Sequence, residues 1–155
     1  MGYEPRVSGD GNGWVICALG HRHWGRFGAA GLLITDGSRV ILQHRSVWTH
    51  EGGTWALPGG ARDSHENAVS AALREAAEET ALDPRAVQAV GSWSDDHGGW
   101  SYTTVLAQAV AEIHPHAANA ESIDIRWWPI GEVADLTLHS GFAAAWPTLR
   151  ALLES

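Results

Sequence analysis

Apolar residues occur along the chain in runs that predict the order of its elements. Two short apolar runs, over 27–35 and 39–45, flank Asp36-Gly37, a dipeptide that favours the tight turn of a β-hairpin. Runs over 86–94 and 101–111 predict a second hairpin with a longer loop. After a polar connection, residues 122–130 alternate like a strand that Pro129 ends.

Between the two hairpins the apolar positions change to a helical period. The residues that share one helical face are Ala68, Ala71, Ala72 and Ala76. This spacing predicts a helix from Ser64 to Thr80. We expect Asp63 or Ser64 to cap its first turn, with Glu66 completing a capping box three residues after Asp63.

The order of these elements indicates the class of fold. Strands grouped before and after one central helix, with another helix over 140–155, predict an α/β fold in which a mixed sheet lies between helices. We expect the last helix to be interrupted near Pro147. Residues 1–13 lack periodicity and are typical of a mobile leader, so a single domain is expected over 14–155.

Charge and composition narrow the classes of partner. A net charge of −8 argues against a nucleic-acid backbone or an anionic membrane surface. The chain shows no apolar run of membrane-spanning length and no secretory signal pattern, which favours a cytoplasmic protein. A polyanionic small substrate is compatible with this charge only if metal ions supply the missing positive charge.

Acidic residues concentrate in the predicted central helix. Glu75, Glu78 and Glu79 share one helical face, where like charges repel by a few tenths of a kcal/mol per pair. Arg74 precedes Glu78 by four residues, and we expect it to clamp Glu78 and leave oxygens of the other two free. Carboxylates are hard ligands that suit Mg²⁺ or Mn²⁺, so the patch predicts a metal site open toward a phosphate ester. The alternative is a solvated acidic face.

The spacing around this acidic patch resembles a known signature. The positions that carry it are Gly60, Glu66, Arg74, Glu75, Ala76, Glu78, Glu79 and Leu82. They are similar to the Nudix box of the MutT-like Nudix hydrolases in eight of its nine specified positions. The ninth is Ala81, where the family usually has the glycine that ends the helix in the left-handed conformation. We expect alanine to cost about 1 kcal/mol there if the backbone keeps that shape.

The resemblance implies a Nudix α/β/α sandwich and a Mg²⁺-dependent pyrophosphohydrolase, with Mn²⁺ as an alternative ion. The substrate would be a nucleoside diphosphate linked to another group: phosphate, as in a normal or oxidised nucleoside triphosphate, or a sugar. The implied metal ligands are Gly59, Glu75, Glu78, Glu79 and Glu121. Glu121 is included because it stands six residues before Trp127, and Asp124 is the reserve.

The same resemblance assigns further roles. Glu75 is the first choice for general base and Glu121 the second, while Arg74 orients the glutamates. The candidate substrate contacts are Arg45, Trp55, Asp95, Asp96 and Trp100. Each has a plainer interpretation: a surface charge for the arginine, packing for the tryptophans, and ordinary turn formation for the aspartates. A homodimer is compatible with the family.

Two alternatives stay open. A non-catalytic Nudix-fold sensor of a nucleotide ligand is the rival function, although such a sensor has no need to hold three repelling carboxylates together. Cys17, His21 and His23 lie close together in the sequence and raise the question of zinc. Because a structural zinc ion needs four ligands and no second pair follows nearby, the sequence favours the plainer interpretation that these residues bind no metal.

Overall fold

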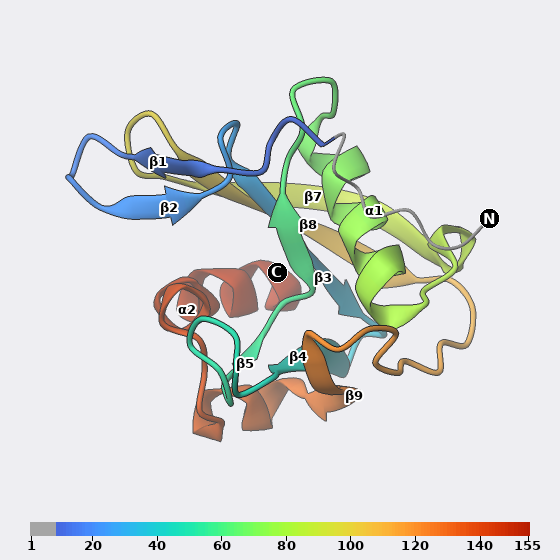
Figure 1. The fold of residues 1–155 in the computed structure, drawn as a ribbon. Helices are drawn as coiled ribbons and strands as arrows, with labels where there is room; N and C mark the ends of the chain where they lie inside the picture. The colour runs from blue at the N-terminus through green and yellow to red at the C-terminus, as the bar shows by residue number, and fades with distance from the viewer. Residues whose placement is uncertain (1–8) are drawn as a thin grey trace.

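A mixed β-sheet packed between two helices is the central feature of the computed structural model, which describes residues 9–155 (Figure 1). The strands are β1 (Trp14–Ile16), β2 (Arg22–Trp24), β3 (Ala29–Thr35), β4 (Arg39–Arg45), β5 (Trp55–Ala56), β6 (Gly59–Ala61), β7 (Val87–Asp96), β8 (Ser101–Ala109) and β9 (Ser122–Pro129). The helices are α1 (Ala68–Thr80) and α2 (Ser140–Glu154), with 3-10 turns η1 (Pro84–Ala86) and η2 (Ile130–Asp135). The predicted α/β sandwich is confirmed.

The seven-stranded sheet is mixed because one pair of neighbours is parallel. Its order is β5-β4-β3-β8-β7, with β6 also paired to β3 and β9 to β4. Strands β3 and β8 run parallel, and the other pairs are antiparallel. The predicted turn joins β3 to β4, where Asp36 Oδ1 accepts from the backbone N–H groups of Ser38 at 3.0 Å and Arg39 at 2.8 Å.

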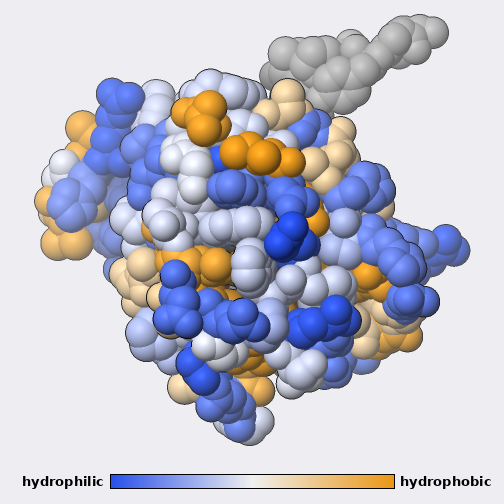
Figure 2. All heavy atoms as spheres, turned by 90° about the horizontal axis from the view of Figure 1, so that it is seen from below, coloured by the Kyte–Doolittle hydropathy of each residue, from blue (hydrophilic) through white to orange (hydrophobic). Residues whose placement is uncertain are grey.

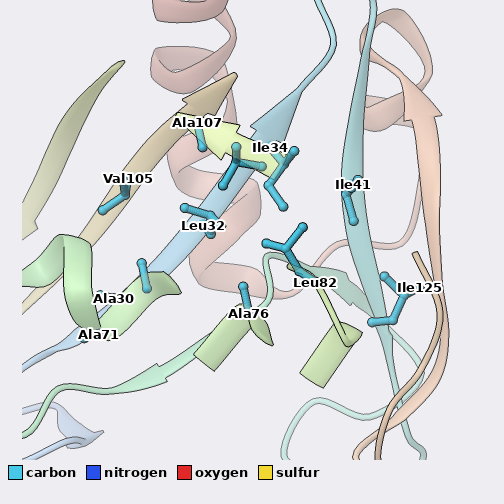
Figure 3. Packing of buried hydrophobic residues seen from close by; sticks show 12 residues of the cluster. Ala30, Leu32, Ile34, Ile41, Ala71, Ala76, Leu82, Val105, Ala107 and Ile125 are labelled. Atoms are coloured by element: carbon cyan, nitrogen blue, oxygen red, sulfur yellow. The ribbon is translucent and has the colours of Figure 1, made fainter. Parts of the chain in front are cut away.

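Alternate residues of β3 supply the two halves of the core. Leu32 and Ile34 face α1, whereas Leu33 belongs to the cluster on the α2 side. On the α1 side, the small residues Ala71 and Ala76 let the helix approach the sheet closely (Figure 3). The α2 side is filled by larger side chains, among them Phe142, Trp146 and Leu149. This alternation is the period-two pattern of a strand covered on both faces.

Both helices differ from the sequence prediction at one point. Helix α1 begins at Ala68 rather than Ser64, because Asn67 is its N-cap and accepts from the Ser70 N–H at 2.8 Å. Helix α2 continues through Pro147 instead of breaking there. A proline removes one backbone hydrogen bond, and burial of Trp146 and Leu149 on either side of it opposes a break.

The sequence also gave no indication of the β1–β2 hairpin. It is a separate two-stranded sheet that projects beside the β7–β8 loop (Figure 1). The predicted leader lies partly outside the described residues, but its end is packed on the domain: the Gly11 N–H donates to Asp63 Oδ1 at 3.0 Å. The face shown in Figure 2 is mainly hydrophilic, with small apolar groups between polar ones. No helix among residues 9–155 has the length and apolarity needed to cross a bilayer.

Candidate active site

An acidic cleft of about 540 Å³ lies between α1, β6 and the connection that leads into β9. This volume falls within the usual range for small-molecule sites. Its lining residues are Asn12, Ala61, Asp63, Arg74, Glu75, Glu78, Glu79, Ala118, Asn119 and Glu121. The structure therefore brings the helical glutamates together with Glu121, which is distant from them in the sequence.

Two glycines of β6 form the floor against which the glutamates lie. A Cβ atom on Gly60 would stand 2.6 Å from the Glu75 carboxyl carbon, so any side chain there would displace Glu75. Gly59 has no room for a side chain either, since its Cβ would lie 2.4 Å from the Ala30 carbonyl oxygen. Its N–H donates to Glu79 Oε2 at 3.1 Å. The glycines thus set the distance between β6 and α1.

Arg74 holds the acidic cluster together, but with closer partners than the one predicted. Its Nε and Nη2 donate to the two oxygens of Glu66 at 2.7 and 2.8 Å. Its Nη1 donates to Glu75 Oε1 at 2.7 Å and lies 3.6 Å from Glu78 Oε2. The predicted pairing with Glu78 is present as this longer contact, but the shorter bonds go to Glu66 and to Glu75, which was expected to keep its oxygens free. Glu66 precedes the helix and meets the guanidinium in the paired geometry that arginine favours.

Burial makes two of the glutamates difficult to ionise. Glu79 is 4% exposed, and burial together with the charges of Glu75 and Glu121 raises its pKa well above the ordinary value. Burial also raises the pKa of Glu75, against the opposing effect of Arg74. Carboxylates in such surroundings become fully charged when a cation joins them. The cluster therefore favours a positively charged ligand.

Glu121 lies at the rim of the cleft, directly before β9. Its N–H donates to Asn119 Oδ1 at 3.0 Å, and its carbonyl accepts from the Ser46 N–H at 3.0 Å. The nearby Ala118 N–H donates to the Glu79 backbone carbonyl at 2.9 Å, which ties this connection to α1. Asp124, the reserve candidate, lies outside the cleft lining and pairs with Arg126 at 3.0 Å.

Arg45 and Trp55 lie outside the residues that line the acidic cleft. Arg45 ends β4 and donates through Nε to the His50 carbonyl at 3.0 Å, yet its charge acts on Glu79 and partly offsets the rise in the pKa of that carboxyl. Trp55 stacks on His44 with ring centroids 4.4 Å apart and packs edge-on against Trp128. The structure thus places Trp55 in packing contacts on the α2 side.

Residues of the β7–β8 loop lie at a second hollow of about 260 Å³. Asp96 and Trp100 line it together with Arg26 and Arg62. Arg62 of this hollow and Asp63 of the acidic cleft are consecutive residues of the β6–α1 connection. Asp95 instead pairs with His97 at 3.2 Å.

Tyr102 is a neighbour of the site that the sequence did not single out. A Cβ atom on Gly31 would lie 2.0 Å from its hydroxyl oxygen, so this glycine makes room for the tyrosine. Burial and the charge of Glu79 raise the pKa of the Tyr102 hydroxyl. A tyrosine inside a predicted strand carries no signal that separates this position from ordinary packing.

Comparison with known proteins is consistent with this geometry. The family profile described as "NUDIX domain" matches residues 25–151. "Putative 8-oxo-dGTP diphosphatase 3" of Mycobacterium tuberculosis is 48% identical over 161 residues, covering 96% of this chain and 73% of that protein. A "Nucleoside triphosphate pyrophosphatase/Nudix hydrolase fusion protein" of Bifidobacterium longum is 40% identical, and the match covers 96% of this chain and 33% of the fusion protein.

Among solved structures, the Nudix hydrolase RenU from M. smegmatis superposes with a TM-score of 0.84 at 46% identity. The match covers 92% of this chain and 94% of that structure. The NUDIX domain of Shewanella oneidensis NrtR, solved with ADP ribose, superposes with a TM-score of 0.61 at 24% identity and shares the fold.

Proposed function

The chain belongs to the Nudix family and is a pyrophosphohydrolase of nucleoside diphosphate derivatives, and from this premise we propose that it acts with Mg²⁺ on an oxidised or normal nucleoside triphosphate. The similarity to the M. tuberculosis protein supports this substrate class over a nucleotide sugar. Mn²⁺ is the alternative ion, and a cytoplasmic location stays a prediction.

One observation carries the proposal: two carboxylates with raised pKa values, the buried Glu79 and the partly buried Glu75, stand beside further acidic groups in an open cleft. Such a donor set fits a hard divalent cation, because carboxylate oxygens are the ligands that Mg²⁺ and Mn²⁺ favour. We assign Glu75, Glu78, Glu79, Glu121 and the Gly59 carbonyl as ligands. When bound, the ion neutralises substrate phosphates and acidifies a water molecule.

The chain's own residues complete the reaction as follows. Glu75, which lines the cleft, is the first candidate to accept a proton from the attacking water. Arg74 holds Glu75 through one oxygen and so orients the other. Glu121 is the second candidate for the base, since it lies exposed at the rim of the same cleft.

The second hollow is the proposed place for the nucleoside. Trp100, whose indole is covered on one face by the stacked His23 ring, and Asp96 line it beside two arginines that can meet phosphate oxygens. A base stacked on an aromatic side chain gains about 1–3 kcal/mol. Arg45 is kept as a phosphate contact because its charge acts on the cleft, while Asp95 and Trp55 remain weaker candidates.

Substitution of single glutamates tests the metal assignment. We expect Glu78→Gln and Glu79→Gln each to abolish Mg²⁺-dependent release of pyrophosphate from 8-oxo-dGTP and dGTP. Each substitution removes a carboxylate ligand while keeping the size and shape of the side chain. Glu112→Gln is the matched control, since Glu112 lies exposed on a surface connection away from the cleft. Unchanged turnover in both cleft variants, with circular dichroism like that of the unsubstituted protein, would refute the assignment.

The role of Glu121 has its own test. If it is a ligand, Glu121→Gln raises the Mg²⁺ concentration needed for half-maximal rate; if it is the base, the rate at saturating Mg²⁺ falls by about 10²–10⁴-fold. A variant with normal rate and normal metal dependence would remove Glu121 from the site.

The rival function, a sensor that binds such a nucleotide without cleaving it, is separated by the same assay. A sensor would bind the nucleotide in calorimetry yet release no pyrophosphate at any Mg²⁺ or Mn²⁺ concentration.

A further inference from the structure

Four metal-ligating side chains meet where the β1–β2 hairpin touches the β7–β8 loop. They are Cys17, His21, His23 and His97, and their candidate ligand atoms all lie within 4.8 Å of one another. Three come from the hairpin in the spacing Cys-x₃-His-x-His, and the fourth comes from a loop more than seventy residues away in the sequence. The fold thus supplies the fourth ligand that the sequence alone did not show.

Hydrogen bonding leaves ring nitrogens of this cluster without partners. Nε2 of His23 and Nδ1 of His97 are buried and accept or donate no hydrogen bond among the described residues. Buried polar atoms are nearly always paired, so two such atoms in one cluster indicate a missing ligand. Cys17, a residue that is 5% exposed, belongs to the same group.

The other nitrogen of His97 is held in the way that metal-bound histidines commonly are. Its Nε2 lies 3.2 Å from Asp95 Oδ2, an arrangement that orients the ring and leaves Nδ1 for a metal. The His23 ring is fixed by stacking on Trp100, with ring centroids 4.0 Å apart and an interplanar angle of 6°. Both rings are therefore oriented before any ion binds.

The backbone brings the two segments into close contact. The Ala18 N–H donates to the Gly98 carbonyl at 2.7 Å, and a Cβ atom on Gly98 would lie 2.5 Å from that of Ala18. Within the hairpin turn, the Cys17 N–H donates to the His21 carbonyl at 2.9 Å. These bonds set the cysteine and the loop histidine on the same side of the turn.

The hairpin is short, and its own side-chain contacts include those of Trp14 with Trp24 and of Arg22 with the Trp14 ring. Each of its strands has three residues, and Trp14, Ile16 and Leu19 are 52%, 74% and 67% exposed. Two-stranded ribbons without a buried face are marginal in water, so a cross-link to the domain would stabilise this one.

We propose that Cys17, His21, His23 and His97 bind a structural zinc ion that joins the β1–β2 hairpin to the β7–β8 loop. One thiolate and three imidazoles form a closed tetrahedral donor set of the kind that zinc prefers over magnesium. Ligand atoms of such a site stand roughly 3.5 Å apart, so closure around the ion needs shifts on the order of 1 Å. The inference does not depend on the proposed hydrolysis.

Metal content tests it directly. The full chain is produced with zinc and dialysed against excess Mg²⁺, which competes for the carboxylate cleft but not for a thiolate and imidazole site. Elemental analysis is expected to find one zinc per chain. Cys17→Ser and His97→Asn lose it, whereas His50→Asn keeps it; His50 belongs to a separate histidine and glutamate group, with Glu51 and His139.

Two further measurements guard against variants that fail to fold. Cobalt bound to the unsubstituted protein should show a thiolate charge-transfer band in the near ultraviolet and the strong visible bands of tetrahedral cobalt. Asp95→Asn, which keeps all four ligands, should weaken zinc binding about 10–100-fold in competition with a chelator. Absence of zinc from the unsubstituted protein, zinc retained by Cys17→Ser, or octahedral cobalt without a thiolate band would overturn the proposal.

Discussion

At the scale of single residues, Ala81 shows how this chain departs from its family and what the departure costs. Helix α1 ends at Ala81 with φ 57° and ψ 22°, the left-handed conformation that glycine normally supplies. The Ala81 N–H still donates to the Ala77 carbonyl at 3.1 Å, so the helix end keeps its shape despite the side chain. The condition under which we expect alanine to be costly, a left-handed backbone at position 81, is therefore confirmed.

Replacing this alanine should stabilise the protein. We expect Ala81→Gly to raise the free energy of unfolding by about 1 kcal/mol, because it relieves the left-handed strain of a Cβ atom. Urea denaturation measures the change. Ala77→Gly, inside the same helix, is the matched control and should lower the free energy by about 1 kcal/mol. Equal losses in both variants would contradict the strain argument.

At the scale of elements, strands and helices could be predicted wherever their own residues carry the pattern. Both hairpins and the strand before η2 lie close to their predicted places, since apolar alternation and turn residues are local signals. The β1–β2 hairpin could not be predicted because its residues are mostly exposed and have no apolar alternation. In the acidic cleft, the Nudix spacing of the sequence predicted the glutamates. The places of Tyr102 and His97 beside their partners could not be predicted, because they depend on pairing between strands that are distant in the sequence.

The start of α2 gives a prediction about pH. His139 is its N-cap: Nδ1 accepts from the Gly141 N–H at 3.1 Å, and Nε2 lies 3.1 Å from Glu51 Oε2. Burial lowers the pKa of His139 below its ordinary value of 6.5, with Glu51 acting in the opposite direction. A proton on Nδ1 would abolish the cap. The stabilising effect is thus complete above pH 6.5 and is lost as pH falls toward the lowered pKa.

Thermal melts at several pH values check this. The melting temperature should fall as pH drops below 6.5, and His139→Asn, which keeps a capping acceptor, should flatten that part of the curve. His114→Asn, an exposed control, should leave the curve unchanged. An identical slope in the His139 variant would rule out the cap as the titrating group.

At the scale of the whole molecule, the acidic cleft lowers the stability of the fold and provides a site for a cation. Glu79 is buried and Glu75 partly buried beside like charges, which costs free energy as long as no cation is bound. The two core clusters on either face of the sheet compensate for it. Removal of divalent ions should therefore change the stability of the fold as well as any activity.

We expect Mg²⁺ at 100 times its dissociation constant to raise the free energy of unfolding of chelator-treated protein by about 2.7 kcal/mol. For a domain of this size that corresponds to a melting temperature higher by roughly 5–10 °C. Scanning calorimetry measures the shift. In Glu79→Gln the Mg²⁺-induced shift should be smaller and the metal-free protein no less stable, because glutamine replaces an acid that burial and like charges make costly to ionise. An equal shift would place the ion elsewhere.

The hydrogen bond from the Ala118 N–H to the Glu79 carbonyl constrains how this chain can change length. It anchors the connection to α1 only three residues before Glu121, so the distance from the helix to that carboxylate is set by a very short stretch of backbone. Residues inserted near the exposed His114 would be accommodated before this anchor. One residue added between Ala118 and Glu121 would have to fit between this bond and the one from the Ser46 N–H to the Glu121 carbonyl, and would displace the Glu121 carboxylate. Relatives should therefore vary in length before this anchor and keep a constant spacing after it.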